Sequence, residues 1–442
     1  MVDTSYEIPF AGLACETGPL TWAQRHIWTI QNAHPHNRSQ FHLCHLWRVP
    51  SGTAERDLLS AMGRLVERHQ ALRTRLPGSP GVLTQEVHGD GVFVVPVREV
   101  ATAEQSQDDL YELAEELIGD DFVWDEEFLA RFAILTVRGT PVWVLLVTSH
   151  MITDGLACAI LKREFLALLD GPSTLPAPTS QPIQWAADER SRRGAETSSR
   201  SATYMREVLR KHPRRLFGEA RPPAGANRPA TNGGFPVVLG HGPMLGEHVR
   251  RLAARWKTSE TSVAVTALAK ACVEHTGIDS FPLGVTCSNR QLPKSAGYVG
   301  MLAQNSLIGV DVSSSTPARM ADQMRRSLLA ASAHSVFDQD ELGEVLAEAG
   351  VDDDYVGFGA VGHFVNYMRL DPSPTAEQRV QFPSIRIEEG NPADYRIPSF
   401  GVVFTSVADD LGVRMFADPA VVPPDLARSV IRSCLEALQS FD

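Results

Sequence analysis

The order of apolar and polar residues predicts alternating strands and helices, and one transition between them is the most informative. Residues 142–147 are apolar, with several β-branched side chains, which predicts a buried strand. Polar residues follow at once, and apolar residues then recur at helical spacing over 156–169. His150 therefore lies where a core strand ends, and Asp154 lies where a helix begins. An aspartate in that position can cap the free N–H groups of the helix.

Similar patterns predict the other elements. Helices are expected after Thr21 and over residues 54–69, 107–118, 245–256, 262–275, 317–334, 339–349 and 424–438. Strands are expected near residues 82–87, 92–97, 130–137, 281–290, 362–370, 385–389, 400–406 and 411–416. Both halves of the chain combine strands with flanking helices, which predicts an α/β sandwich in each half.

Length and composition exclude several classes of protein. A chain of 442 residues suggests two domains of about 200 residues each. No apolar run approaches the roughly 20 residues of a membrane span, and the first residues lack the basic and apolar regions of a signal peptide. We therefore expect a cytoplasmic protein without a membrane partner. The net charge of −12 argues against a nucleic-acid partner.

Cysteines and histidines give little support for a metal centre. None of the six cysteines forms a C-x-x-C pair, and most lie in apolar segments, so we expect reduced core thiols. Five possible ligands crowd together without a recurring ligand spacing: His34, His36, His42, Cys44 and His45. No metal is expected.

Residues 149–155, SHMITDG, resemble the H-H-x-x-x-D-G motif of the condensation domains of nonribosomal peptide synthetases. The wider superfamily contains chloramphenicol acetyltransferase and the H-x-x-x-D acyltransferases. Ser149 replaces the first motif histidine, and His150 matches the second, which the family uses for chemistry.

Further segments share this resemblance. The first motif of the family is matched by Leu20, Thr21, Ala23, Gln24 and Trp28. The second is matched by Arg68, His69, Leu72, Arg73 and Thr74, whose two arginines we interpret as structural ion-pairing groups. A late segment is matched by Arg290, Gly300, Asn305 and Leu307. The matches cover the chain from Leu20 to Leu438, which is the extent of a single condensation domain, and so suggest a free-standing enzyme.

The resemblance implies an α/β fold of two chloramphenicol-acetyltransferase-like sandwich lobes, arranged as a V-shaped pseudo-dimer with the active-site tunnel between them. The expected divisions are an N-terminal lobe over residues 1–180, an inter-lobe helix and linker over 181–230, and a C-terminal lobe over 231–442. Two such lobes need no second chain to close the site, so we expect a monomer.

The resemblance also assigns roles in the site. His150 is the candidate catalytic base, because a neutral imidazole accepts a proton readily near pH 7. Asp154 is expected to pair with Arg290 in a structural role, and the Gly155 N–H to help stabilise an oxyanion. Ser149, Arg290 and Asn305 are expected to support the site.

Two other arrangements of the same residues are weaker hypotheses. A hydrolase triad of Ser149, His150 and Asp154 conflicts with strand geometry, because neighbouring residues of a strand point to opposite faces. There is also no G-x-S-x-G elbow. A zinc pair of His150 and Asp154 lacks a third ligand.

Three functions agree with these features. The first is a condensation enzyme that joins an acyl or aminoacyl group, bound as a phosphopantetheine thioester to an acyl or peptidyl carrier protein, to a small amine or alcohol by an amide or ester bond. The second is a coenzyme A-dependent acyltransferase of the same fold. The third is a catalytically silent module that recruits a tailoring enzyme, a possibility that the loss of the first motif histidine leaves open. None of these requires a bound cofactor.

A run of basic residues between Arg190 and Arg215 stands out in this acidic chain. Charge runs usually face water, so a solvated helix is the simpler interpretation. The alternative is a docking face for an acidic carrier protein.

Overall fold

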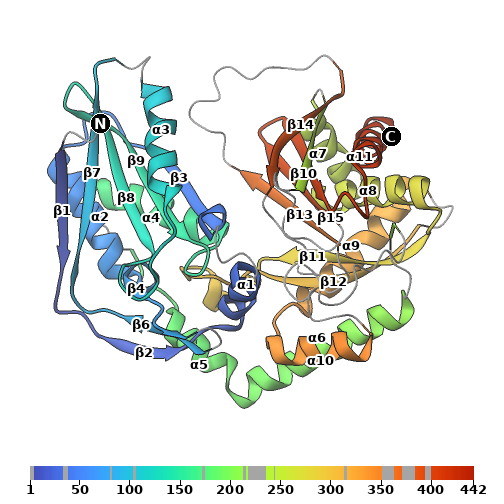
Figure 1. Cartoon of the computed structure of the whole chain (residues 1–442), viewed down its shortest axis with the longest axis horizontal. Helices are drawn as coiled ribbons and strands as arrows, with labels where there is room; N and C mark the ends of the chain where they lie inside the picture. The colour runs from blue at the N-terminus through green and yellow to red at the C-terminus, as the bar shows by residue number, and fades with distance from the viewer. Residues whose placement is uncertain are drawn as a thin grey trace. The chain divides into compact units, whose positions relative to one another are not determined.

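The computed structural model describes residues 4–32, 38–79, 82–102, 106–171, 175–212, 216–217, 235–242, 244–312, 316–350, 363–370, 384–393 and 400–442. The chain divides into two compact units (Figure 1). The first consists of Met1–Ala195 together with Ser288–Ala303, and the second of Glu196–Cys287 together with Gln304–Asp442.

The first unit is built on a five-stranded sheet with helices on both faces. Its strand order is β1 (Thr4–Phe10), β7 (Gly91–Val100), β8 (Ala130–Val137), β9 (Thr140–Ser149) and β3 (His42–Arg48). Only β7 and β8 run parallel. Strand β9 has a neighbour on each side, and its residues 143–149 are buried, as its apolar sequence predicts.

Neighbouring residues of β3 show how the two faces of this sheet are covered. Leu46 packs with the apolar cluster that helix α3 (Ser106–Gly119) contributes on one face. Trp47 points to the other face and packs against Phe165 of helix α4 (Gly155–Leu169), with the rings tilted and their centroids 5.0 Å apart. Helix α2 (Glu55–Arg68) packs against α4.

A small second sheet in the first unit has the order β2 (Glu16–Pro19), β6 (Val82–Val87) and β4 (Thr74–Arg75), with β5 (Gly78–Ser79) paired to β6. Helix α1 (Trp22–Asn32) follows it, and helix α5 (Pro182–Glu189) packs against β2. The predicted Thr21 cap of α1 is confirmed. Its hydroxyl accepts from the Gln24 N–H at 3.1 Å, and the Gln24 side chain accepts from the Thr21 N–H at 2.8 Å.

The second unit is built on a seven-stranded sheet. Its order is β12 (Gln304–Asp311), β11 (Ser280–Cys287), β13 (His363–Leu370), β15 (Phe400–Val407), β16 (Asp410–Ala417), β10 (Phe235–Gly242) and β14 (Arg386–Ala393). Strand β13 runs parallel to both of its neighbours, and the other pairs are antiparallel. The helices are α6 (Arg192–Lys211, which begins in the first unit), α7 (Leu245–Trp256), α8 (Glu260–Thr276), α9 (Pro317–Ala333), α10 (Gln339–Glu348) and α11 (Pro424–Ser440). Apolar residues of α7, α8 and α11 form one core with the sheet.

The α/β class expected from the sequence is confirmed. The predicted helices and strands that lie in the described residues are present, with ends that differ by a few residues. Seven strands were not predicted, because none of them has an apolar run as long as that of β9: β1, β2, β3, β4, β5, β10 and β12.

The boundaries of the units differ from the predicted lobes at two places. Residues 181–195 pack with the first unit, which leaves the proposed linker shorter. Residues 288–303, here called the crossover segment, leave the second unit after β11, pack in the first unit and return at β12. Arg290 was expected in the C-terminal lobe and belongs instead to the first unit.

No helix in the described ranges is both long enough and apolar enough to cross a membrane.

Candidate functional site

The candidate site lies at the turn between β9 and α4, both of the first unit. Strand β9 ends at Ser149, and α4 begins at Gly155. The five residues between them form a tight connection in which the Ile152 N–H donates to the Ser149 carbonyl at 3.1 Å. His150 is partly exposed, whereas the four residues that follow it are buried. The imidazole of His150 is therefore the partly exposed group of an otherwise buried turn.

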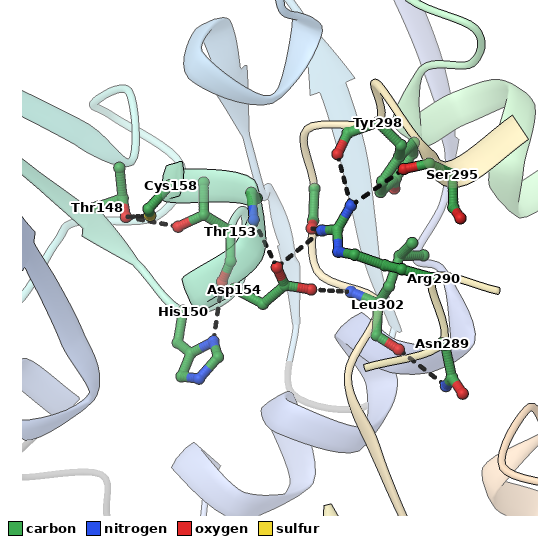
Figure 2. Close-up of polar contacts among 12 residues, drawn as sticks. Thr148, His150, Thr153, Asp154, Cys158, Asn289, Arg290, Ser295, Tyr298 and Leu302 are labelled. Atoms are coloured by element: carbon green, nitrogen blue, oxygen red, sulfur yellow. Dashed lines mark hydrogen bonds and ion pairs between the residues drawn. The ribbon is translucent and has the colours of Figure 1, made fainter. Parts of the chain in front are cut away.

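The imidazole of His150 is fixed by the backbone of its own turn. Its Nδ1 lies 2.8 Å from the Thr153 carbonyl oxygen (Figure 2). A carbonyl only accepts, so Nδ1 bears the proton and Nε2 keeps its lone pair. Burial lowers the pKa of His150 below 6.5, although the nearby Asp154 charge and the bond to Thr153 oppose this shift. The ring is therefore neutral at pH 7 and Nε2 can accept a proton.

Asp154 has four hydrogen-bonding roles and none of them involves the imidazole. Its Oδ1 accepts from the Ala157 N–H at 2.8 Å, so it caps α4 as predicted. The same oxygen accepts from Arg290 Nη2 at 2.7 Å, and Oδ2 accepts from the Leu302 N–H at 3.0 Å. Its backbone carbonyl accepts from the Cys158 N–H at 3.0 Å. The predicted pair of Asp154 and Arg290 is present, and it lies within one compact unit.

Arg290 is held by backbone carbonyls of its own segment. Nη1 donates to the Tyr298 carbonyl at 2.8 Å, and Nη2 donates to the Gly300 carbonyl at 3.1 Å (Figure 2). The side chains of Arg290 and Asp154 are only 9% and 6% exposed, so the pair is buried. These carbonyls and the carboxylate compensate for much of the hydration that the guanidinium loses.

Ser149 occupies the position of the first motif histidine and is fully buried. Its hydroxyl oxygen accepts from the Met151 N–H at 3.3 Å, which stabilises the turn before Asp154. Within the described residues it has no hydrogen bond to His150, whose ring bonds Thr153 instead. This geometry agrees with the argument against a hydrolase triad.

Gly155 opens helix α4 and is exposed. A Cβ added there would meet no atom within 4 Å, so neither close packing nor backbone conformation within the protein requires glycine. In the described part of the chain, no acceptor is found for the Gly155 N–H. An N–H group at a helix N-terminus favours a nearby negative charge.

Asn305 belongs to the second unit and is the one predicted site residue outside the first. It lies on β12 opposite Thr286 of β11, and its side-chain oxygen accepts from the Thr286 hydroxyl at 2.9 Å. The structure therefore brings together Ser149, His150, Asp154, Gly155 and Arg290, and it places Asn305 in a separate strand pair.

The second motif is structural, as expected, although its two arginines differ. Arg68 Nε donates to Glu164 Oε2 at 2.6 Å, and His69 Nε2 lies 2.8 Å from the same oxygen. Arg73 instead donates to the backbone carbonyls of Ala14 and His88. The prediction of ion pairing is confirmed for Arg68, whereas no ion pair of Arg73 is found among the described residues.

Three arginines of the basic run have hydrogen-bonding partners within the protein. Arg206 forms a bidentate ion pair with Glu348 of α10, and Arg200 donates to the Thr197 hydroxyl. Arg190 donates to the carbonyls of Ala186 and Leu20. Arg214 and Arg215 lie outside the described residues. This pairing favours the simpler interpretation of a solvated helix.

No group of three or more His, Cys, Asp or Glu side chains with the geometry of a metal site occurs among the residues described. His34 and His36 lie outside those residues. His42 bonds the Ile118 carbonyl at 3.1 Å, which gives its imidazole a structural role.

Sequence reasoning missed the backbone groups of this site. The Thr153 carbonyl, the Leu302 N–H and the Tyr298 carbonyl set the tautomer of His150 and the placement of the ion pair. Backbone groups have no signature in a sequence motif. The only available signal was the resemblance around Gly300, which marked the segment as a whole.

Comparison with known proteins identifies the family. The condensation-domain family model matches residues 15–392. The AMB antimetabolite synthetase AmbB of Pseudomonas aeruginosa is 30% identical over 305 residues, which are 66% of this chain and 23% of that protein. The phosphinothricin tripeptide synthetase PhsC of Streptomyces viridochromogenes is 23% identical over 66% of this chain and 27% of its own. The chain thus spans about a quarter of the length of these relatives.

Solved structures show the same fold. A structure of condensation domain-mediated chain release from the enacyloxin polyketide synthase aligns with a TM-score of 0.74 at 20% identity, over 97% of this chain and 83% of its own. The SgcC5 protein of Streptomyces globisporus aligns with a TM-score of 0.72 at 18% identity, over 96% and 99%. The chain therefore belongs to the condensation-domain family, the acyltransferases that form amide or ester bonds on carrier-bound substrates in natural-product biosynthesis.

Proposed function

We propose that this chain joins an acyl or aminoacyl group, presented as the phosphopantetheine thioester of a carrier protein, to a small amine or alcohol. The observation that most supports this proposal is the state of His150. Its Nδ1–H is fixed on the Thr153 carbonyl, and burial lowers the pKa of the ring. A neutral imidazole with a free Nε2 is the group that an attacking amine or alcohol needs.

In the proposed reaction the acceptor attacks the thioester carbonyl while His150 Nε2 takes the acceptor proton. A C–N or C–O bond forms, and the tetrahedral intermediate then expels the phosphopantetheine sulfur as the C–S bond breaks. The proton on Nε2 passes to that sulfur, which leaves as a thiol and restores neutral His150. No redox agent or metal ion enters this balance.

The N-terminus of α4 is the proposed location of the oxyanion. The Gly155 N–H and the helix dipole both favour negative charge there. The open space over Gly155 leaves room for a substrate atom to approach the backbone. Glycine would then be required for the substrate rather than for the fold.

Arg290 removes an electrostatic conflict between Asp154 and the proposed oxyanion. The carboxylate of Asp154 lies at the same helix N-terminus, where its charge alone would oppose a developing oxyanion. The guanidinium 2.7 Å from Oδ1 neutralises that charge. Asp154 and Arg290 are therefore proposed as positioning and neutralising groups, while His150 reacts.

A coenzyme A-dependent acyltransferase is the second candidate, because coenzyme A presents the same phosphopantetheine thioester to the same imidazole. The intact geometry around His150 and Asp154 argues against a silent recruiting module, since a module of that kind needs neither a set tautomer nor a neutralised carboxylate. The buried hydrogen bond of Ser149 also supports a structural replacement of the first histidine.

A substrate panel tests the proposal. The purified protein is incubated with acyl and aminoacyl carrier proteins, with the matching coenzyme A thioesters, and with mixed amine and alcohol acceptors, and products are identified by mass spectrometry. We expect a product from carrier-bound donors that is absent with His150→Ala. Equal turnover of the coenzyme A thioesters would favour the second candidate, and binding of loaded carrier without any turnover would contradict acyl transfer.

A further inference from the structure

Helix α5 and the residues before it contact the crossover segment through its middle. The Thr179 hydroxyl donates to the Lys294 carbonyl at 2.6 Å. Lys294 Nζ donates to Asp188 Oδ2 at 2.8 Å and lies 4.2 Å from the centroid of the Trp185 ring. These contacts join residues more than a hundred positions apart, and all of them lie within the first unit.

Trp185 is the centre of this contact. It forms a buried apolar cluster with Tyr298 and Leu302 of the crossover segment, and the rings of Trp185 and Tyr298 have centroids 4.8 Å apart. A buried tryptophan contributes a large apolar surface, so this cluster dominates the attachment of the segment. The partly exposed pair of Lys294 and Asp188 adds less.

Glu189 fixes the orientation of the Trp185 ring. The indole Nε1–H donates to Glu189 Oε1 at 3.1 Å. The other carboxyl oxygen accepts from the Trp22 N–H at 2.7 Å, at the first residue of α1. Trp185 is thus held on one side by a buried carboxyl group, whose pKa is raised to about 8 by burial, and packs on its other side against the crossover segment.

The two residues that Trp185 packs against provide the backbone groups that hold Arg290 and Asp154 in place. The Tyr298 carbonyl accepts from Arg290 Nη1, and the Leu302 N–H donates to Asp154 Oδ2. Displacement of Tyr298 and Leu302 therefore moves both the guanidinium and the N–H away from the carboxylate. Asp154 directly precedes Gly155, whose N–H is the proposed oxyanion donor.

We propose that Trp185 is a positioning residue for acyl transfer. It holds the crossover segment so that Arg290 and the Leu302 N–H remain on Asp154, and it touches no substrate. Its effect on the reaction rests on the proposed function, whereas its effect on the crossover segment does not. Catalytic rate and order of the segment are therefore measured separately.

Trp185→Phe is the test variant and Trp47→Phe is its matched control. Both tryptophans are buried in the first unit, but Trp47 packs against Phe165 of α4, away from the crossover segment. Hydrogen–deuterium exchange followed by mass spectrometry reports on peptides that cover residues 288–303. With Trp185→Phe we expect faster exchange in these peptides and a fall in kcat of about tenfold at nearly constant KM, because small misplacements near a reacting centre are costly. With Trp47→Phe we expect lower thermal stability, unchanged exchange in these peptides and unchanged kcat.

Lys294→Gln is a second variant for the case in which Trp185→Phe does not fold. Its side chain is 37% exposed, so the protein tolerates the change, and we expect a smaller effect in the same direction on both exchange and kcat. Unchanged exchange over residues 288–303 in both variants would overturn the proposal, whether or not the protein turns over carrier-bound donors. Faster exchange with an unchanged kcat would also overturn it, because the segment would then be loosened without consequence for the site.

Discussion

Helix α4 has two buried carboxylates, one at its N-cap and one within the helix. Each carboxylate is paired with an arginine and lies near a histidine. Asp154 at its N-terminus binds Arg290, and Glu164 within it binds Arg68. The two groups differ in what the histidine does. His69 lies 2.8 Å from Glu164, whereas His150 bonds the Thr153 carbonyl and leaves the carboxylate to the arginine.

The two histidines also differ in how far their side chains are exposed to solvent. The His69 side chain is 0% exposed, and its remaining nitrogen, Nδ1, is buried and without a hydrogen-bond partner among the described residues. His150 is partly exposed, and its Nε2 is available. The same three residue types therefore form a structural tie in one place and a site suited to proton transfer in the other. The comparison teaches that suitability for proton transfer depends on whether the unbonded ring nitrogen is accessible, and not on the presence of a carboxylate.

The electrostatic balance also separates the two groups. Burial alone would raise the pKa of Glu164, but hydrogen bonds from His69 and Arg68 outweigh burial and lower it. For His69, burial lowers the pKa of the imidazole, although the hydrogen bond to Glu164 and the charge of Glu164 oppose this shift. This trio is stable as long as the carboxylate keeps its charge, and it has no group left to exchange protons with a substrate.

The largest expected effect is that of His150→Ala on turnover. Removal of a general base lowers the rate by about 10²–10⁴-fold, and we expect a loss in this range at nearly unchanged thermal stability, because the ring is partly exposed. Steady-state product formation and thermal melting measure the two quantities. Wild-type turnover by this variant would remove His150 from the mechanism.

Asp154→Ala is expected to act on stability. It leaves Arg290 buried without its carboxylate and removes the cap of α4, and the loss of one partner of a buried pair costs about 3–5 kcal/mol. Urea unfolding measures the free energy of unfolding. Asp154→Asn is the isosteric comparison. Native stability of this variant together with greatly reduced turnover would argue for a direct catalytic role of the carboxylate.

His69→Ala tests the structural group in the same way. Loss of the imidazole leaves Glu164 with one donor fewer in a buried position, which costs about 1–3 kcal/mol of unfolding free energy. Turnover of the folded fraction should equal that of the wild type. Reduced turnover at full occupancy of the folded state would show that the two histidine groups are coupled.

The smallest effect concerns pH. Since His150 must be neutral to accept a proton, turnover rises as pH rises through its pKa and is constant above it. The pKa is lowered from 6.5 by burial, so the acid limb lies below that value. The rate at pH 6 should therefore remain within about fourfold of the plateau. A pH–rate profile on saturating substrates measures the midpoint, and a midpoint clearly above 6.5 would contradict the burial argument.

Much of the fold and of the candidate site could be predicted from the sequence, because hydrophobic periodicity and motifs are local features of the chain. The strand from Val142 and the helix to Leu169 follow from hydrophobic periodicity, and the pair of Asp154 and Arg290 follows from the family resemblance. Patterns of this kind describe elements and not the path of the chain between them. The position of residues 288–303 in the first unit depends on packing against Trp185, which no periodicity reveals.

The difference between His150 and His69 could be predicted only in part from the sequence. The resemblance assigns chemistry to His150 and structure to the motif around His69, but it does not say why. The reason lies in backbone geometry, since a turn carbonyl faces the ring in one case and a helix carboxylate in the other. The roles of Ser149, Gly155 and Asn305 in the site remain predictions.

A single-turnover comparison of His150→Ala with His69→Ala tests the central claim most directly. A carrier protein loaded with one acyl group is mixed with excess enzyme and acceptor, and the rate of product formation is followed by mass spectrometry at matched concentrations of folded protein. The account predicts a rate at least about 100-fold lower for His150→Ala and a wild-type rate for His69→Ala. Equal rates for the two variants would contradict it, because the free Nε2 would then confer no advantage.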